Sequence, residues 1–383
     1  MTAHLAEIRG VVRDYAWGTP GGISRALGMP ASDAPEAELW LGSHPSAPSR
    51  FHESARWADL ADWERSEGTR VPFLLKLLSA ASPLSLQAHP TPEQAAEGFA
   101  REEAAEIARD ARERNYKDPH AKPELIVALE DGFEALCGFR PVAETLAVID
   151  ALAAEATDPE PFAVWRDRLA AAEGIRAAFE DLLAGRPGVQ ALVAQIADIA
   201  GRLPGRFEPA GRIATEYPGD PGIAIALMLN HVTLRRGEAL WLPAGNIHAY
   251  LCGTGVELMG PSDNVLRGGL TPKHIDIPEL TRVLDFTPGP APYLPPISLT
   301  QHAVTYRPRS LATGSDVPFE LIEVTADDTV ATTGPAIGLL VDGAFTIEVD
   351  GETIELERGR AVFVSDAATL GIRGSGRLFV ATV

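Results

Sequence analysis

A strand, a tight turn and a second strand follow one another in Gly237-Glu238-Ala239-Leu240-Trp241-Leu242-Pro243-Ala244-Gly245-Asn246-Ile247-His248-Ala249-Tyr250. The apolar run ends at a Pro-Ala-Gly turn, because proline and glycine favour the backbone conformations of turns. The next strand begins near His248, which places an imidazole, a common metal ligand, directly after the turn. The stretch therefore predicts a β-rich core with a metal-capable side chain at the start of a strand.

Two more metal-capable side chains lie in a shorter apolar run, Pro83-Leu84-Ser85-Leu86-Gln87-Ala88-His89-Pro90. A strand alternates its side chains with period two, so Gln87 and His89 should point to the same face. For an isolated pair, a buried and hydrogen-bonded Gln–His contact is the more common explanation. The pair gains weight only from the other candidates along the chain.

A carboxylate opens a further apolar run, Glu124-Leu125-Ile126-Val127-Ala128-Leu129. Burying this side chain is costly unless a cation or a donor meets it, and Lys122 lies two residues before it. A surface Lys–Glu pair at a strand end is the alternative interpretation. If Glu124 is buried, its position predicts a fourth metal-capable side chain.

Together, Gln87, His89, Glu124 and His248 offer two imidazoles, one carboxylate and one amide oxygen. Such a set suits a catalytic Zn²⁺ with an open position for water or substrate. Two histidines and one carboxylate also describe a non-haem Fe(II) site, so the ligand types alone do not fix the metal.

A Gly-rich loop follows, and it concentrates charge between Gly255 and Asp276. Asp263, Asn264, Arg267 and Lys273 lie within it, bracketed by glycines and prolines that permit close approach of the backbone to a ligand. A solvated loop with a capping Asp is the alternative. Arg267 favours a functional loop, because directed guanidinium donors suit an anion or a developing oxyanion.

The motifs quoted so far occur in one order that is shared with a known family. Further matching segments are Asp14-Tyr15-Ala16-Trp17-Gly18, Glu38-Leu39-Trp40-Leu41-Gly42-Ser43-His44-Pro45 and Pro72-Phe73-Leu74-Leu75-Lys76-Leu77-Leu78-Ser79. The turn-plus-histidine stretch is typical of cupin-type barrels. Nearly end to end, the chain resembles the class I mannose-6-phosphate isomerases, which are zinc-dependent enzymes of the cupin fold.

The resemblance implies roles for particular residues. It implies that one Zn²⁺ per chain is bound by Gln87, His89, Glu124 and His248. By the same resemblance, the candidates for catalysis are Arg267, Glu257, Lys122 and Asp263. The candidates for substrate binding are Ser85, Lys273, Trp17 and Tyr250. The chain departs from the family at Ala121, where relatives often carry a histidine before the lysine, while His120 is displaced by one position.

The reaction that the resemblance implies is the interconversion of mannose 6-phosphate and fructose 6-phosphate through a cis-enediol. Zinc and Arg267 would stabilise the negative charge that develops as a proton moves between C1 and C2. Glu257 is the candidate base, because an apolar strand could raise its pKa toward neutrality. A glutamate that faces solvent is the equally weighted alternative.

The expected fold is mainly β with α insertions: two cupin-type jelly-roll β-barrels and an inserted α-helical subdomain. Residues 1–141 and 222–287 are expected to form the metal-binding barrel. Apolar residues recur at helical spacing within 142–221, which predicts the helical insertion. Residues 288–383 begin with a Pro-rich linker and are expected to form a second barrel without metal ligands.

Some finer expectations concern individual segments. High helix propensity predicts a helix from Glu93 to Arg114, and strands are expected to resume near Ile223. Asp342-Gly343 and Asp350-Gly351 predict hairpin turns in the second barrel. Cys137 and Cys252 are too few for a disulfide framework and are expected to be small buried hydrophobes.

Composition narrows the choice of partners. The formal net charge of −20 argues against nucleic acid, and the absence of an apolar run near twenty residues argues against a membrane span. Without a signal-peptide pattern at the N-terminus, a cytoplasmic monomer acting on a sugar phosphate is expected. Two alternatives from other classes are an Fe(II)-dependent cupin dioxygenase and a non-catalytic sugar-binding cupin.

Overall fold

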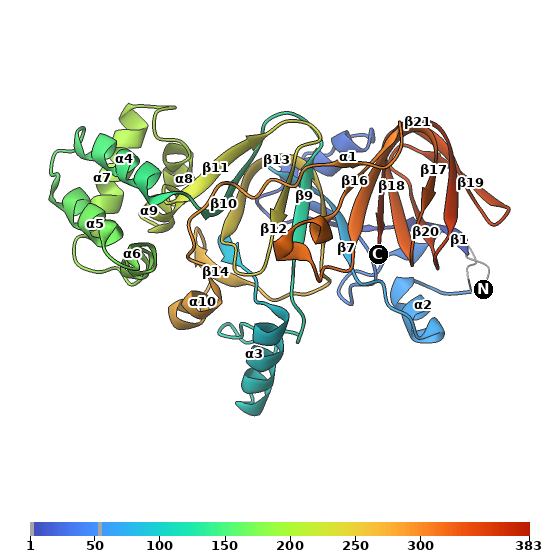
Figure 1. Ribbon diagram of the computed structural model, residues 1–383, viewed down its shortest axis with the longest axis horizontal. Coiled ribbons are helices and arrows are strands. Elements are labelled where there is room, and N and C mark those ends of the chain that lie inside the picture. The colour runs from blue at the N-terminus through green and yellow to red at the C-terminus, as the bar shows by residue number, and fades with distance from the viewer. Residues whose placement is uncertain (1–3, 53–55) are drawn as a thin grey trace.

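The computed structural model describes residues 4–52 and 56–383. Figure 1 shows three regions in a row: a group of helices at one end, a first sheet in the middle and a second sheet at the other end. The C-terminus lies at the second sheet. The regions are named here the helical region, the first sheet and the second sheet.

The first sheet contains ten of the described strands. They are β2 (Val11–Arg13), β5 (Glu38–Leu41), β7 (Leu74–Ala80), β8 (Leu86–Ala88), β9 (Glu124–Ala128), β10 (Phe133–Phe139), β11 (Leu229–Leu234), β12 (Ala239–Leu242), β13 (His248–Met259) and β14 (Leu266–Gly269). Strand β13 is its centre, because it pairs with β7, β8, β9 and β10.

Strand β7 explains how the first sheet buries both of its faces. All seven of its residues are buried. Leu78 and Ala80 pack with Ile126 in the interior of the first sheet, whereas Leu75 and Leu77 pack toward the second sheet. Alternation of side chains along a strand sends neighbouring residues to opposite faces, so a nearly continuous apolar run is required here.

The second sheet contains nine of the described strands. They are β1 (Leu5–Arg9), β6 (Arg50–Phe51), β15 (Ile297–Ser298), β16 (Ala303–Tyr306), β17 (Glu320–Ala331), β18 (Ala336–Val349), β19 (Glu352–Glu357), β20 (Ala361–Val364) and β21 (Thr369–Thr382). Strand β1 pairs with β20, so the start of the chain belongs to the second sheet rather than to the metal-binding half assigned from the sequence. A small separate ribbon joins β3 (Thr19–Pro20) to β4 (Pro35–Glu36).

The helical region packs on the β11 side of the first sheet (Figure 1). Its helices are α4 (Val142–Ala153), α5 (Glu160–Ala170), α6 (Gly174–Leu183), α7 (Val189–Arg202), α8 (Ala210–Glu216) and α9 (Gly222–Ala226). Their apolar faces share one core with residues of the first sheet, including Phe139 and Leu229. Spacing of apolar side chains every three or four residues is what buries one face of each helix.

The remaining helices lie beside the two sheets. They are α1 (Gly22–Ala26), α2 (Leu60–Glu67), α3 (Pro92–Ala104), α10 (Ile277–Val283) and the 3₁₀ turns Pro308–Ser310 and Ala312–Gly314. Helix α3 begins with a capping box at Thr91, in which the Thr91 hydroxyl and the Gln94 side chain exchange hydrogen bonds with backbone N–H groups.

The fold class predicted from the sequence is confirmed, since the described chain is mainly β with α insertions. Four finer expectations were wrong. The helix expected to reach Arg114 ends at Ala104, and the segment near Ile223 is the helix α9, so the strand begins only at Leu229. Asp342-Gly343 lies inside the continuous strand β18, at a register shift, instead of forming a hairpin turn. Cys252 is only partly buried.

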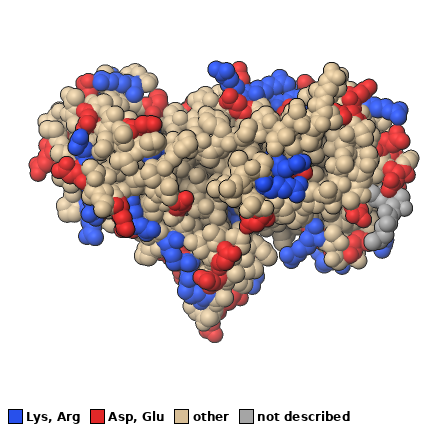
Figure 2. Space-filling model, in the orientation of Figure 1, with Lys and Arg blue, Asp and Glu red and all other residues tan. Residues whose placement is uncertain are grey.

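Surface charge is mixed on the face shown in Figure 2, where acidic and basic side chains alternate over all three regions. The acidic excess of the sequence therefore forms no single continuous field on this face. No helix of the described residues is both long enough and apolar enough to cross a bilayer.

Candidate functional site

Three neighbouring strands and one strand end bring the four predicted ligands into the first sheet. Gln87 on β8 lies directly opposite His248 at the start of β13. Glu124 opens β9, which is also a neighbour of β13, and His89 follows β8 by one residue. Residues separated by as many as 161 positions therefore meet because β13 pairs with both ligand-bearing strands.

The ligand atoms of His89, Glu124 and His248 all lie within 4.8 Å of one another. Glu124 Oε1 is 3.4 Å from His89 Nε2, and Glu124 Oε2 is 3.2 Å from His248 Nε2. All three side chains are buried. His89 Nε2 and Glu124 Oε2 nevertheless have no hydrogen-bond partner among the described residues. Buried polar atoms without partners are costly, and a cation between them would satisfy both.

The fourth predicted ligand lies beside this cluster. Gln87 Nε2 is 3.4 Å from His248 Nε2. Half a turn about the last bond of Gln87 exchanges its amide nitrogen for its carbonyl oxygen. The set is then two imidazole nitrogens, one carboxylate and one amide oxygen, which fits a zinc ion.

Hydrogen bonds to backbone carbonyls orient both imidazole rings. His89 Nδ1 is 2.8 Å from the carbonyl of Asn264, and His248 Nδ1 is 3.0 Å from the carbonyl of Asn246. An Nδ1–H that donates to a carbonyl leaves the Nε2 lone pair free for a metal. The Nε2 atoms are the ones that face Glu124, so the two rings are held in the tautomer that a metal site needs.

The turn predicted at Pro243-Ala244-Gly245 is tied to the same site. The Gly245 N–H donates to the carbonyl of His89 over 2.9 Å. Gly245 has a φ of +78°, and an added Cβ would lie 3.0 Å from the carbonyl oxygen of Val283. Glycine is required here because side chains strain such a backbone and the space is filled. The turn therefore connects the loop of one histidine with the strand of the other.

The Asn264 amide holds together the two loops that flank the site. Its Nδ2 donates to the carbonyls of Asp118 (2.7 Å) and His120 (2.9 Å), and its Oδ1 accepts from the backbone N–H of Lys117 at 2.7 Å. The side chain is fully buried. Asn264 therefore fixes the loop before Lys122 and Glu124 while its own carbonyl orients His89.

Charge around the ligands is balanced by Lys122. Its Nζ lies 2.9 Å from Glu124 Oε1. Burial raises the pKa of Glu124, but Lys122 and the two histidines together hold the pKa of this carboxyl well below its usual range. Burial lowers the pKa of His89 to about 4. At neutral pH both residues are therefore in the protonation state that binds metal.

A second buried charge cluster, named here the Lys76 cluster, lies next to the ligands on the interior of the first sheet. Lys76 Nζ is 3.1 Å from Glu257 Oε2 and 3.3 Å from Glu38 Oε1. The Tyr250 hydroxyl donates to Glu257 Oε1 over 2.9 Å, and Trp40 Nε1 donates to Glu38 over 2.7 Å. Glu257 thus lies in the interior and does not face solvent, with a pKa raised by burial.

Lys76 lies in a segment that matches the family, but the sequence predicted no role for this lysine. Burial lowers the pKa of Lys76, but Glu257 and Glu38 outweigh it and raise the pKa above its usual range. The signal was present in Leu74-Leu75-Lys76-Leu77-Leu78, because a lone charge in a buried strand is rare without a partner or a function. Glu38, at the start of β5, gives the same signal.

Arg267 on β14 lies opposite Gln87 on β8, which places it beside the ligands. It is half-buried, and burial lowers its pKa. Lys273 is exposed, and burial together with the charges of Arg267 and Lys117 lowers its pKa. The three cations share one side of the site, which makes that side suited to an anionic group.

The other predicted residues are placed less centrally. The Asp263 carboxylate lies 3.4 Å from His44 Nε2, whose hydrogen bond lowers the pKa of Asp263. Ser85 is half-buried just before β8. Trp17 stacks on Tyr15 and packs at the edge of the interior core of the first sheet. The sequence predicted no role for His44, although its segment matches the family.

The departure at Ala121 leaves no histidine in its place. His120 is exposed and lines a groove of about 300 Å³ together with Ala121, Pro123 and Trp241. The imidazole of His120 makes no hydrogen bond or ion pair within residues 4–52 and 56–383.

Comparison with known proteins gives concordant results. Residues 5–142 match the family described as phosphomannose isomerase type I, catalytic domain. The chain is 35% identical to the mannose-6-phosphate isomerase of Escherichia coli (strain K12), with 96% of each chain covered. It is 33% identical to the human mannose-6-phosphate isomerase, over 73% of this chain and 72% of that one.

Solved structures of similar sequence share the fold over nearly the whole chain. A zinc-bound mannose 6-phosphate isomerase superposes with a TM-score of 0.86 at 32% identity, and the alignment covers 99% of each chain. The apo form from Salmonella typhimurium gives a TM-score of 0.85 at 32% identity, covering 99% of this chain and 98% of that one.

Proposed function

The chain belongs to the type I phosphomannose isomerase family, and on that premise we propose that it interconverts mannose 6-phosphate and fructose 6-phosphate with the help of one zinc ion. The observation that carries the proposal is the buried cluster of His89, Glu124 and His248, in which two polar atoms lack a protein partner. These atoms fit a metal ion, and Arg267 lies opposite Gln87 on β8, the strand that His89 directly follows.

Gln87, His89, Glu124 and His248 would hold the ion. When bound, zinc supplies Lewis-acid polarisation of substrate oxygens and stabilises negative charge that develops on them. The chain contributes the rigid setting, because the Asn264 and Asn246 carbonyls fix the rings and Lys122 fixes one oxygen of Glu124. A preorganised site of this kind spends no reorganisation energy during the reaction.

Glu257 is the proposed base that moves the proton between C1 and C2. Burial raises the pKa of its carboxyl, and a base works best when its pKa lies near the working pH. The ammonium of Lys76 at 3.1 Å keeps a fraction of Glu257 ionised in spite of burial, and the Tyr250 hydroxyl fixes its other oxygen. Lys76 and Tyr250 are therefore proposed to set the protonation and the orientation of the base. For Tyr250 this role replaces the substrate contact predicted from the sequence, because the side chain is buried and its hydroxyl donates to Glu257.

Arg267 is proposed to stabilise the enediolate, because it lies opposite a zinc ligand and makes no ion pair or side-chain hydrogen bond within the described ranges. Lys273, Ser85 and Trp17 are proposed to contact the substrate, with Lys273 nearest to the cationic side that suits a phosphate. Asp263 is held by His44 and is proposed to assist opening of the sugar ring.

The test is isomerisation of mannose 6-phosphate by the purified full chain, measured as prepared, after chelation and after zinc is added back. The Arg267→Ala variant is compared with Arg373→Ala, an exposed arginine of the second sheet. Zinc-restored turnover that falls only in Arg267→Ala supports the proposal. Inactive, folded, zinc-loaded protein contradicts it, and substrate-dependent oxygen uptake by the iron-loaded protein would favour the dioxygenase alternative.

We propose further that the active unit is a cytoplasmic monomer. Every residue proposed for the site comes from one chain, so completing the site requires no second copy. The proposed division of the chain is a metal-binding part, the helical insertion in 142–221 and a C-terminal part from residue 288, whose sheet also takes in β1 and β6. Light scattering on the active protein tests the monomer, and activity that appears only in a dimer fraction would contradict it.

A further inference from the structure

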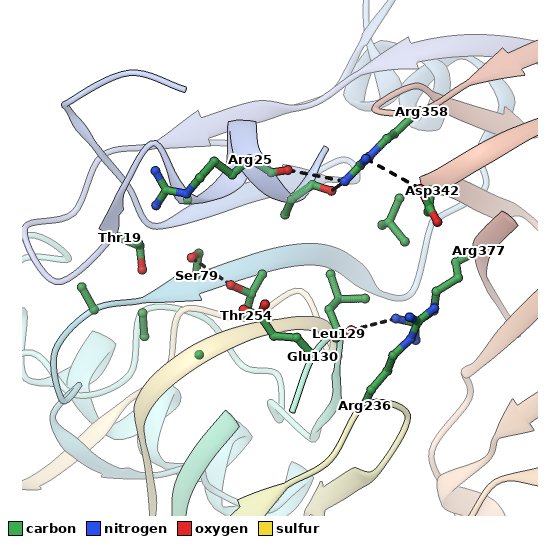
Figure 3. Close-up of a pocket in the computed structure, with 16 residues that line it drawn as sticks. Thr19, Arg25, Ser79, Leu129, Glu130, Arg236, Thr254, Asp342, Arg358 and Arg377 are labelled. Atoms are coloured by element: carbon green, nitrogen blue, oxygen red, sulfur yellow. Dashed lines mark hydrogen bonds and ion pairs between the residues drawn. The ribbon is translucent and has the colours of Figure 1, made fainter. Parts of the chain in front are cut away.

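A cavity of about 640 Å³ lies where the first sheet meets the second sheet. Figure 3 shows Ser79 and Thr254 of the first sheet on one side of it, and Asp342 and Arg377 of the second sheet on the other. None of the four proposed zinc ligands borders the cavity. It is named here the junction cavity, and its size is that of typical small-molecule sites.

The junction cavity is lined by more basic than acidic groups. Its charged lining consists of Arg25, Arg236, Arg358, Arg377, Glu130 and Asp342. Asp342 pairs with Arg358 at 3.7 Å. In a chain with a net charge of −20, an excess of arginine at one cavity is a local feature that the overall composition does not explain.

Two of these arginines have no partner for their charge. The side chains of Arg25 and Arg236 are exposed and make no ion pair or hydrogen bond within the part of the chain that the structure describes. In Figure 3, Arg25 extends toward the side of Thr19, whereas Arg236 and Arg377 point toward the side of Leu129. Cationic groups therefore border the junction cavity at two ends, with Arg25 at the end near Thr19 and with Arg236 and Arg377 at the end near Leu129.

The guanidinium of Arg377 is held in a fixed position at the junction cavity by two hydrogen bonds. It is only 5% exposed, its Nε donates to Glu323 Oε1 over 2.5 Å, and its Nη1 donates to the carbonyl of Leu129 over 2.9 Å. Its Nη2 forms no hydrogen bond with any described residue. A guanidinium held at two nitrogens and free at the third presents a directed donor to an anion.

Hydroxyl groups line the junction cavity between these two cationic ends. Ser79 Oγ is 3.1 Å from Thr254 Oγ1, and Thr19 lines the same wall. Hydroxyls of this kind can donate to or accept from the hydroxyls of a sugar. The wall also contains apolar side chains, Ala80, Ala81 and Val341, which suit the carbon face of such a ligand.

We propose that the junction cavity is a second ligand site, which binds a sugar carrying two phosphate groups. One phosphate lies at Arg25 and the other at Arg236 and Arg377, with the sugar hydroxyls against Ser79 and Thr254. Because the lining comes from both sheets, the ligand joins the two halves of the chain. Strands β7 and β13 then connect the junction cavity with the active site, since they also carry Lys76 and Glu257.

The test is isothermal titration of fructose 1,6-bisphosphate into the full, zinc-loaded chain. The Arg236→Glu variant is compared with Arg235→Glu, which makes the same charge change at the adjacent exposed residue outside the cavity. We expect Arg236→Glu to weaken binding about tenfold or more and Arg235→Glu to leave it unchanged. Arg25→Glu should weaken it similarly, and melting temperatures verify that each variant is folded.

The Arg267→Ala variant distinguishes binding at the junction cavity from binding at the active site. It should bind fructose 1,6-bisphosphate as the wild-type chain does, and Arg236→Glu should still weaken that binding. The proposal is overturned if the wild-type chain shows no binding at millimolar ligand. It is overturned equally if the two neighbouring variants bind alike, or if Arg267→Ala alone abolishes binding. All of these experiments measure binding affinity, so their outcome does not depend on whether the chain is an active isomerase.

Discussion

The first and second sheets both bury charged side chains, but they satisfy them differently. In the second sheet, Glu323 accepts from Arg377 Nε at 2.5 Å and from the Tyr306 hydroxyl at 3.3 Å. In the first sheet, His89 Nε2 and Glu124 Oε2 are buried and have no hydrogen-bond partner among the described residues. A satisfied buried charge is explained by the fold alone, whereas an unsatisfied one calls for a ligand.

The difference matters because the two sheets are otherwise built alike. Both are mainly antiparallel and both contribute to the apolar core between them. The second sheet has no cluster of three histidine, cysteine or carboxylate ligands within the described residues. We therefore assign the chemistry to the first sheet and a supporting role to the second, and each of the following predictions tests that division.

The largest effect is expected for Glu124→Gln, which removes a charged ligand but keeps the shape of the side chain. We expect kcat/KM to fall on the order of 10³-fold, because the metal provides several kcal/mol of transition-state stabilisation. Zinc content, measured by elemental analysis, should fall in parallel. The matched variant Glu323→Gln in the second sheet should keep its zinc. Equal loss of zinc in both variants would contradict the assignment of the metal site to the first sheet alone.

The next effect concerns Glu257. Since burial raises the pKa of this base, wild-type kcat/KM should decline, as the pH falls, at a higher pH than an ordinary carboxyl would give. Glu257→Gln should reduce kcat/KM on the order of 10²-fold and remove this acidic limb from the pH profile. Glu38→Gln, which changes the other carboxylate beside Lys76, should retain it. If the pH profile of Glu257→Gln kept this acidic limb, the base would be a residue other than Glu257.

Local patterns in the sequence were sufficient to predict part of this site. Alternation along β8 predicted that Gln87 and His89 act together, and the Pro-Ala-Gly turn predicted the position of His248. These features depend on residues that are close in the chain, so periodicity and turn chemistry report them.

Contacts between distant segments could not be predicted in the same way. The pairing of β1 with β20 joins the two ends of the chain, and nothing in the local pattern of Leu5–Arg9 selects that partner. The Asn264 side chain bonds backbone groups about 145 residues away, and a single asparagine in a loop gives no sign of this. The helix expected to reach Arg114 also ends early, at Ala104, and Arg114 lies beyond it, buried with its Nε 2.9 Å from Glu102 Oε2.

A stability effect without a catalytic one is expected in the second sheet. Glu323→Gln leaves the buried Arg377 without its countercharge, so the free energy of unfolding should fall by about 3 kcal/mol. Denaturant unfolding measures the change, and kcat/KM of the folded fraction should stay within about twofold. The exposed Glu355→Gln in β19 is the control and should change stability by less than about 0.5 kcal/mol. Loss of activity without loss of stability would give the second sheet a direct role in catalysis.

The smallest effect separates orientation of a ligand from stability of the fold. Asn264→Ala removes the amide that fixes the loop before Glu124, so we expect zinc affinity to fall about tenfold. Asn230→Ala is the matched control, because its amide also clamps backbone carbonyls, those of Cys137, Gly138 and Gly289, without contacting a ligand. Both variants should lose stability, whereas only Asn264→Ala should bind zinc more weakly in a competition titration with a chelator. If the two variants lost zinc equally, the affinity would depend on the stability of the first sheet as a whole, and the clamping of the loop before Glu124 by the Asn264 amide would contribute nothing of its own.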